Sequence, residues 1–334
     1  MSSSVDRYLL GFDLGGTRLK SATVAPDGRV LRSAMQETGS NVNASVLVSM
    51  LLDTARSLMS DSDAIRCGGV GVALPGFVDP TFGARGLPGK LPGMEGYPLR
   101  ERVERELGLP VRCIADGAAA TMAEWLAGAG AGVDDVVVIT LGTGVGSGVI
   151  INGQPLANRH LGTGGGIGQF TIQTGGRLCL CGNRGCAETL ISTPAVVGKL
   201  NEHLARGVRS SLQAIYTRNP AAITFRSLID GVARGDRLCA DVLNGFVRDL
   251  GATIVSAIHA YNPSVVVLCG GMTEAADTFL PAVQRYVDEY RWVHPGSRQI
   301  PVLKGTLEPF AGAIGAALQA NRTTDHAAHH EMTD

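Results

Sequence analysis

The sequence lacks a charge excess and any apolar run long enough to cross a membrane. Its 334 residues carry 29 Lys and Arg against 30 Asp and Glu, a formal net charge of −1. No sequence-wide positive charge is available to neutralise a phosphate backbone, so we expect no nucleic-acid partner. Apolar runs such as residues 136–139 are strand length, far below the ~20 residues that span a bilayer, so we expect no membrane partner.

An export signal is also missing from the sequence. Residues 1–13 contain neither a basic segment nor a sustained apolar core, which are the parts of a secretory leader. We therefore expect a cytoplasmic protein whose seven cysteines are reduced thiols.

Glycine, in contrast, is abundant. The chain has 45 glycines, about twice the average share, and they gather where apolar runs end. Glycine at a strand end allows a positive φ and lets backbone N–H groups approach a ligand closely. This distribution favours phosphate-binding turns on a packed scaffold.

A strand, a glycine turn and a second strand occur twice. The first copy runs over residues 8–13, 14–17 and 19–24, and the second over 136–140, 141–144 and 145–151. In register, Asp13 matches Thr140 and Gly15 matches Gly142. The copies are too far apart for a solenoid repeat, so we predict two duplicated halves that face each other across a cleft.

Strands and helices alternate along the rest of the chain, which predicts an α/β fold with parallel strands. Apolar spacing predicts helices over 42–59, 99–107, 118–127, 193–206, 225–234 and 236–261, and strands over 69–74, 110–114 and 263–268.

The first glycine turn carries groups suited to phosphate and magnesium. Asp13 ends the strand, two glycines follow, and Thr17 and Lys20 come just after them. Backbone N–H groups suit phosphate oxygens, and a carboxylate suits Mg²⁺ or its waters. The alternative is an ordinary turn with a capping Asp. Other nucleotide motifs fail: a dinucleotide fingerprint needs glycine at Ser147, and a P-loop ending at Gly89-Lys90 needs glycine at Ala84.

Three thiols lie within eight residues at Cys179, Cys181 and Cys186. Glycines between them let the chain curl around one point, and thiolates are zinc ligands. The alternative is three buried, inert cysteines. The other cysteines lie in apolar contexts and are predicted core residues: Cys67, Cys113, Cys239 and Cys269.

In combination, these elements resemble the ROK family of sugar kinases and related repressors, from residue 11 to about residue 318. The matching pieces are the two glycine turns (13–20 and 140–148), the segments 69–79 and 90–124, the cysteine loop with Glu188, and Gly270-Gly271. Family repressors carry a helix-turn-helix domain before the first turn. Here about ten residues precede that turn, so we expect a kinase.

The resemblance implies a two-domain actin-like ATPase (ribonuclease H-like, hexokinase) fold and an ATP-dependent phosphoryl transfer, with Mg²⁺, to a hydroxyl of a sugar-like substrate. It assigns domains to residues 1–117 with the helix 309–320, and to 118–308. It also implies a homodimer or homotetramer. The polar composition of residues 321–334 predicts a disordered tail. The tail histidines His326, His329 and His330 are read as a solvated end.

Site residues follow from the same resemblance. Asp116 is the implied catalytic base, and its place at a helix start suits a carboxylate that stays ionised. Implied contacts to ATP are Asp13, Gly15, Gly16, Thr17, Lys20, Gly142, Thr143, Gly144, Gly270 and Gly271, with the last two at the adenosine. Implied substrate contacts are Gly76, Asp116 and Glu188, with Gly166 and Gln169 at the altered positions described next.

The chain departs from the family pattern at four polar positions. Ala115 and Ala118 flank Asp116 where the family has asparagine, Gly166 replaces a sugar-binding glutamate, and Gln169 replaces the zinc-binding histidine. A site that loses hydrogen-bond partners no longer selects the same hydroxyls. We therefore expect a substrate other than plain glucose, with a C7-cyclitol of the valiolone type favoured.

Three alternatives remain open. One is an ordinary hexose kinase acting on glucose or N-acetylmannosamine, and another is a catalytically silent sugar-binding protein. For the metal, Gln169 is a weak ligand, so a structural Zn²⁺ held by the cysteines needs water or another residue, for which His160 is a candidate.

Overall fold

The computed structural model describes residues 7–39, 42–60, 66–79, 83–85, 91–156, 166–292 and 298–321. Gly89, Lys90, His160 and the tail from residue 322 lie outside the described residues.

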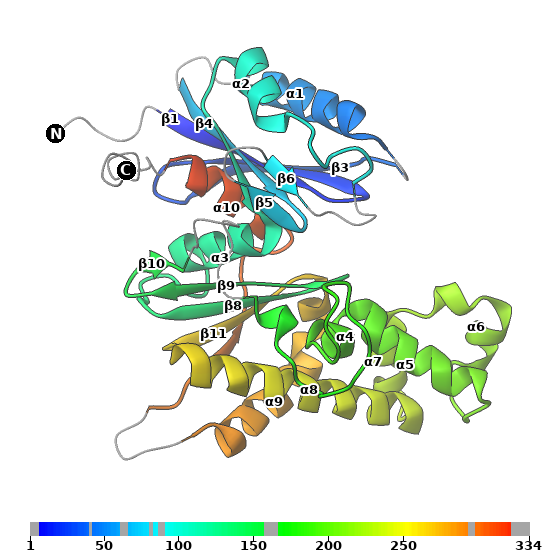
Figure 1. Ribbon diagram of the computed structural model, residues 1–334. Coiled ribbons are helices and arrows are strands. Elements are labelled where there is room, and N and C mark those ends of the chain that lie inside the picture. The colour runs from blue at the N-terminus through cyan, green and yellow to red at the C-terminus, as the bar shows by residue number, and fades with distance from the viewer. Residues whose placement is uncertain are drawn as a thin grey trace. The chain divides into compact units, whose positions relative to one another are not determined.

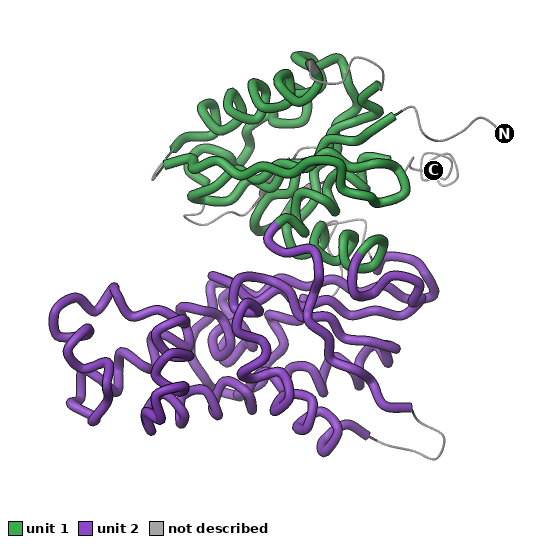
Figure 2. Tube along the Cα trace, turned by 180° about the vertical axis from the view of Figure 1, so that it is seen from behind, with its two compact units in different colours: residues 1–127, 158–162, 310–334 green, residues 128–157, 163–309 purple. Residues whose placement is uncertain are grey.

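The chain divides into two compact units (Figure 2). Unit 1 comprises residues 1–127, 158–162 and 310–334, and unit 2 comprises 128–157 and 163–309. The boundary between the units comes after helix α3 (Asp116–Ala127), so α3 belongs to unit 1. It belongs there because α3 packs against the last helix, α10 (Ala311–Ala320). The final helix therefore returns to the unit in which the chain began.

Unit 1 is built on a five-stranded sheet with the order β3-β2-β1-β4-β7 (Figure 1). Strands β1, β2 and β3 form an antiparallel meander, and β4 and β7 join β1 in parallel. The strands are β1 (Arg7–Leu14), β2 (Arg18–Val24), β3 (Val30–Glu37), β4 (Arg66–Leu74) and β7 (Val111–Ala115). A small hairpin, β5 (Phe77–Asp79) and β6 (Gly83–Arg85), follows β4.

Helices cover both faces of this sheet. Helices α1 (Ala44–Ser60) and α2 (Leu99–Leu107) share an apolar core with it. On the other face, small residues let α3 and α10 approach closely, and Ala73, Ala119 and Ala316 pack together there. Gly71 of β4 has no room for a side chain because a Cβ would overlap the backbone of Ala316.

Unit 2 repeats the same sheet. Its order is β10-β9-β8-β11-β12, with β8, β9 and β10 antiparallel in sequence and β11 and β12 parallel to β8. The strands are β8 (Val136–Leu141), β9 (Val145–Ile151), β10 (Gln154–Pro155), β11 (Val265–Cys269) and β12 (Val302–Lys304). The matching order and directions confirm the duplication that the two glycine turns predict.

The helices of unit 2 build a larger core around Phe246 and Phe279, whose rings meet edge to face with centroids 5.3 Å apart. They are α4 (Glu188–Ile191), α5 (Thr193–Ala205), α6 (Gln213–Arg218), α7 (Phe225–Ala233), α8 (Arg237–Tyr261) and α9 (Ala276–Tyr290), with short 3₁₀ turns η1 (Ile167–Gln169), η2 (Pro220–Ala222) and η3 (Gly271–Ala275). Within the described ranges, no helix is both long and apolar enough to cross a bilayer.

Candidate functional site

The first glycine turn, in unit 1, joins two strands whose side chains pair across it. Asp13 of β1 and Lys20 of β2 are register partners, and the Lys20 Nζ lies 3.3 Å from the Asp13 Oδ2. The turn itself is closed by a hydrogen bond from the Gly15 N–H to the Arg18 carbonyl oxygen, at 2.9 Å. Gly16 and Thr17 are exposed at its tip, which leaves their backbone N–H groups on the surface of the turn.

Helix α10 begins beside the Asp13 carboxylate. A Cβ placed on Gly312 would lie 2.9 Å from the Asp13 Oδ2, so only glycine leaves space for this carboxylate. The free N–H groups and positive end of a helix N-terminus favour negative charge. Asp13 therefore lies between the Lys20 ammonium group and the start of α10.

Asp116 lies at the same sheet edge as Asp13. Strands β1, β4 and β7 are parallel neighbours, so their carboxyl ends meet at one edge, where Asp13 lies near the end of β1 and Gly76 and Asp116 follow β4 and β7. Asp116 is the first residue of α3, and its Oδ1 accepts the Gly117 N–H at 2.7 Å. Gly76 has a φ of +84°, a conformation that favours glycine. The fold thus brings three of the predicted residues to one edge.

The second glycine turn, in unit 2, is held from outside by Glu188 and Thr193. The Glu188 Oε2 accepts the Val145 N–H at 2.9 Å, and the Thr193 N–H donates to the Gly142 carbonyl oxygen at 2.8 Å. Inside the turn, the Gly142 N–H donates to the Gly144 carbonyl oxygen at 3.1 Å. Glu188 is therefore a structural partner of this turn, a role that the sequence did not reveal.

The altered position Gly166 immediately precedes η1 and Gln169 is the last residue of η1, which packs against the start of β9. A Cβ on Gly168 would overlap the Val145 carbonyl oxygen, so η1 lies close to the residue that Glu188 holds. The Gln169 Oε1 lies 3.5 Å from the position of a Cβ on Gly166. This distance is an ordinary van der Waals contact, and both residues are exposed, so a side chain at position 166 would lie beside the Gln169 amide.

Gly270 and Gly271 follow β11 at the edge where β8 also ends. The two strands are parallel, with Cys269 opposite Thr140, so the Gly270 turn and the Gly142 turn belong to one edge of the unit 2 sheet. A Cβ on Gly270 would lie 2.8 Å from the Leu141 backbone nitrogen. The predicted phosphate and adenosine residues of unit 2 are therefore neighbours. The Gly270 N–H donates to Glu308, which sequence reasoning missed.

The three loop cysteines converge as their spacing suggests. Their Sγ atoms all lie within 4.8 Å of one another, and the Cys181 Sγ is 3.6 Å from the Cys186 Sγ. The loop is closed by the Cys179 N–H, which donates to the Asn183 carbonyl oxygen at 2.8 Å. Among the described residues, these three thiols form a cluster that could hold a metal ion.

The three thiols differ in their protonation. Burial raises the pKa of Cys186 to about 12 and also raises the pKa of Cys179. Cys181 is exposed, and a hydrogen bond with the Asn183 backbone lowers its pKa. Cys181 is therefore the thiol of this group that ionises first.

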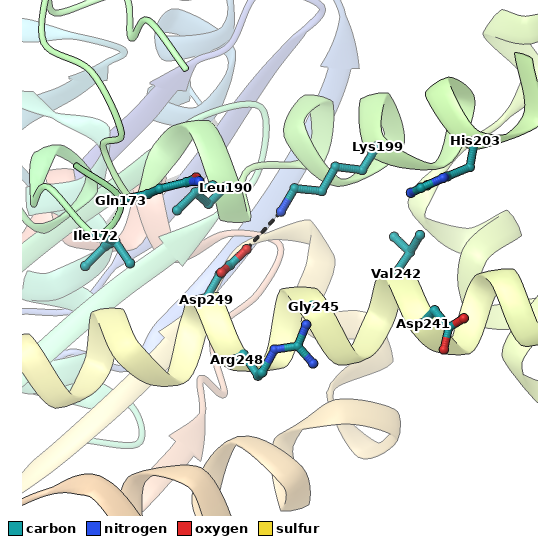
Figure 3. A pocket seen from close by; sticks show the side chains of 10 residues that line it. All are labelled: Ile172, Gln173, Leu190, Lys199, His203, Asp241, Val242, Gly245, Arg248 and Asp249. Atoms are coloured by element: carbon teal, nitrogen blue, oxygen red, sulfur yellow. Dashed lines mark hydrogen bonds and ion pairs between the residues drawn. The ribbon is translucent and has the colours of Figure 1, made fainter. Parts of the chain in front are cut away.

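A separate cavity of about 520 Å³ opens between α5 and α8 of unit 2 (Figure 3). In it the Lys199 Nζ lies 2.8 Å from the Asp249 Oδ2, and His203, Asp241 and Arg248 also line it. No predicted site residue lines this cavity, although Leu190 and Gln173 connect it to α4 and to the cysteine loop.

Comparisons with known proteins agree with this arrangement. The model of the ROK family matches residues 9–323. The glucokinase of Thermotoga maritima is 30% identical over 92% of this chain and 96% of its own. A ROK glucokinase from Streptomyces griseus, solved with glucose and AMPPNP, superposes with a TM-score of 0.78 at 26% identity over 94% of this chain and 99% of its own.

A ROK transcriptional regulator, described as a homologue of the E. coli Mlc protein, also superposes. Its TM-score is 0.80 at 25% identity, over 94% of this chain and 78% of its own. The solved relatives and the two matching sheets confirm the expected two-domain actin-like ATPase fold.

Proposed function

Because the chain belongs to the ROK family, we propose that it is an ATP-dependent kinase that phosphorylates a hydroxyl of a sugar-like ring. The observation that carries this proposal is Asp116, held at the start of α3 at the same sheet edge as the first glycine turn. The Thermotoga and Streptomyces relatives, which are glucokinases, support the same reaction class.

In the proposed reaction, the substrate hydroxyl oxygen attacks the γ-phosphorus of ATP. The bond between that phosphorus and the β,γ-bridging oxygen breaks, ADP leaves, and Asp116 accepts the hydroxyl proton. Phosphoryl transfer has a loose transition state, so orientation of the hydroxyl and stabilisation of charge matter more than a strong base. The Gly117 N–H, bound to the Asp116 Oδ1 at 2.7 Å, orients the carboxylate for this task.

The two glycine turns supply backbone N–H groups for the phosphates in this proposal, together with Lys20 and the Thr17 and Thr143 hydroxyls. Bound Mg²⁺ would neutralise phosphate charge, and oxygen ligands are what this ion prefers. Asp13 fits that role because its carboxylate lies on the last-but-one residue of β1, beside the phosphate turn. Gly270 and Gly271 would border the adenosine.

For the substrate, we propose a ring other than glucose, with a C7-cyclitol favoured. Four positions that are polar in the family pattern are Ala115, Ala118, Gly166 and Gln169, and Ala115 is buried. A buried alanine offers no hydrogen bond to a hydroxyl. Each lost hydrogen bond of about 1.4 kcal/mol corresponds to about a tenfold loss, so substrate preference follows the missing partners.

A screen of ADP release with Mg·ATP tests this proposal. Hexoses and N-acetyl sugars are compared with cyclitols and valiolone-type carbasugars. We expect kcat/KM for glucose to be about 100-fold below that of the best cyclitol, a ratio equivalent to the loss of about two hydrogen bonds among the four altered positions. Comparable or better turnover of glucose contradicts the cyclitol proposal and retains the kinase. No turnover of any ring contradicts the kinase and favours a binding protein.

We also propose that Cys179, Cys181 and Cys186 hold a structural Zn²⁺. Their convergent thiols fit three of its four tetrahedral positions, whereas Gln169 is a weaker donor than the histidine of the family pattern. The site therefore needs a water molecule or another residue as its fourth ligand.

Alkylation provides the test of the zinc proposal. In chelator-treated protein, we expect iodoacetamide at pH 7.5 to modify Cys181 before the other six cysteines, since its thiol is exposed and its pKa is lowered. One equivalent of Zn²⁺ should protect Cys181, as measured by peptide mass spectrometry. Equal labelling of Cys181 with and without Zn²⁺ would show that these thiols do not hold the metal.

A further inference from the structure

The turn after β11 is closed by a carboxylate from far along the chain. The Gly270 N–H donates to the Glu308 Oε1 at 2.6 Å. Glu308 follows β12, the parallel neighbour of β11, and the Gly305 N–H still reaches the Leu268 carbonyl oxygen at 2.8 Å. Glu308 thus supplies the next acceptor beyond the last backbone hydrogen bond between these two segments.

Two other residues, Leu141 and Thr273, restrict the Cα and the carbonyl oxygen of Gly270, whereas its N–H donates to Glu308. Its φ of +90° and ψ of 166° suit glycine, and a Cβ would overlap the Leu141 carbonyl oxygen. Its own carbonyl oxygen accepts the Thr273 N–H at 2.9 Å and the Thr273 hydroxyl at 2.7 Å. Thr273 is buried, so its two hydrogen bonds fix the carbonyl side of Gly270, and the orientation of the Gly270 N–H depends on the Glu308 hydrogen bond.

We propose that Glu308 is a positioning residue for the nucleotide. It holds the Gly270-Gly271 turn in the shape that borders the adenosine, and its carboxylate acts through that turn. Without the acceptor, the turn reorganises. Part of the binding free energy of a nucleotide is then needed to order the turn again, which weakens nucleotide affinity. The proposal rests on the kinase function proposed above. It predicts an effect on nucleotide affinity and none on affinity for the ring.

Three variants of Glu308 separate the roles of acceptor and charge. Glu308→Ala removes both, Glu308→Asp keeps the charge but withdraws the acceptor by one methylene, and Glu308→Gln keeps an acceptor of the same reach. Glu202→Ala is the matched control because it deletes an exposed carboxylate, paired with Arg206 at 2.6 Å, from α5 of the same unit.

Calorimetric titration with ADP measures nucleotide affinity without turnover. We expect about a tenfold rise in Kd for Glu308→Ala and Glu308→Asp, equivalent to about 1.4 kcal/mol, and a Kd within about threefold of wild type for Glu308→Gln and Glu202→Ala. In turnover assays, KM for ATP should rise in the same variants while KM for the ring stays unchanged. A structural role without positioning would instead lower both affinities together.

The possible failures are distinguishable. If Glu308→Ala is unfolded by circular dichroism, Glu308→Asp carries the test. If the wild-type chain binds ADP and the Glu308→Asp variant binds it with the same Kd, the role of Glu308 is overturned and the kinase function remains intact. A wild-type chain that binds no ADP overturns the kinase function and this proposal together.

Discussion

Asp116→Asn is expected to lower kcat about 1,000-fold, within the range that removal of a general base produces. The amide has the size of the carboxylate, and its Oδ1 can still accept the Gly117 N–H that the carboxylate now accepts at 2.7 Å. The start of α3 should therefore remain intact. The amide cannot take up the hydroxyl proton, so the loss should appear in kcat while the Kd for ADP stays unchanged.

The measurement is ADP release with the best substrate from the screen, next to calorimetric binding of ADP. Asp53→Asn is the matched control, because Asp53 is an exposed carboxylate of the same unit that pairs with Arg56 at 3.4 Å on α1. This control should keep wild-type kcat. If Asp116→Asn retained more than about a tenth of the activity, another group would have to accept the proton.

Gly71→Ala is expected to destabilise unit 1 by more than about 4 kcal/mol, a loss that point mutations rarely reach. The new Cβ would overlap the carbonyl oxygen of Ala316, and its next neighbours are also backbone atoms of that residue. Backbone of a packed helix cannot rotate away as a side chain can. Helix α10 would have to move away from the sheet. The packing of α10 and α3 on that face would then be lost as well.

Urea unfolding followed by circular dichroism measures this effect. Gly68→Ala on the same strand is the control, because the nearest atom to its Cβ is the Arg7 Cδ, at 3.3 Å in a long flexible side chain. The control should cost less than about 1 kcal/mol, because only the end of a flexible side chain has to move. Similar stabilities for the two variants would mean that Gly71 of β4 and Ala316 of α10 do not pack in direct contact.

Regular elements were predicted well where the local pattern is strong. Helix α2 has the predicted bounds Leu99–Leu107, with Gly108 in a left-handed conformation after it, because a stop signal and an amphipathic pattern coincide. Strand β3 was missed, since seven of its eight residues are exposed and it carries no alternation of apolar and polar residues. Helix α9 was also missed, and it contains Pro281, a residue that usually interrupts helices.

The candidate site was predictable where it consists of contiguous motifs. The two glycine turns, the cysteine loop and Asp116 each depend on residues that are close in the chain. The partners of these motifs were not predictable. Glu188 accepts a hydrogen bond from Val145, 43 positions away, and Glu308 accepts one from Gly270, 38 positions away. The residues near either glutamate in the sequence do not indicate which N–H group donates to it.

The sequence by itself determined the duplicated strand-turn-strand units, the family and the chemical character of each motif, because these follow from residue types at short spacing. Only the tertiary structure decided which sheet edge gathers Asp13, Gly76 and Asp116, and which side chains hold the turns. Strand order sets those neighbours. It depends on how whole apolar faces pack, as at Gly71 and Ala316, and a local pattern carries no information about the face that it will meet.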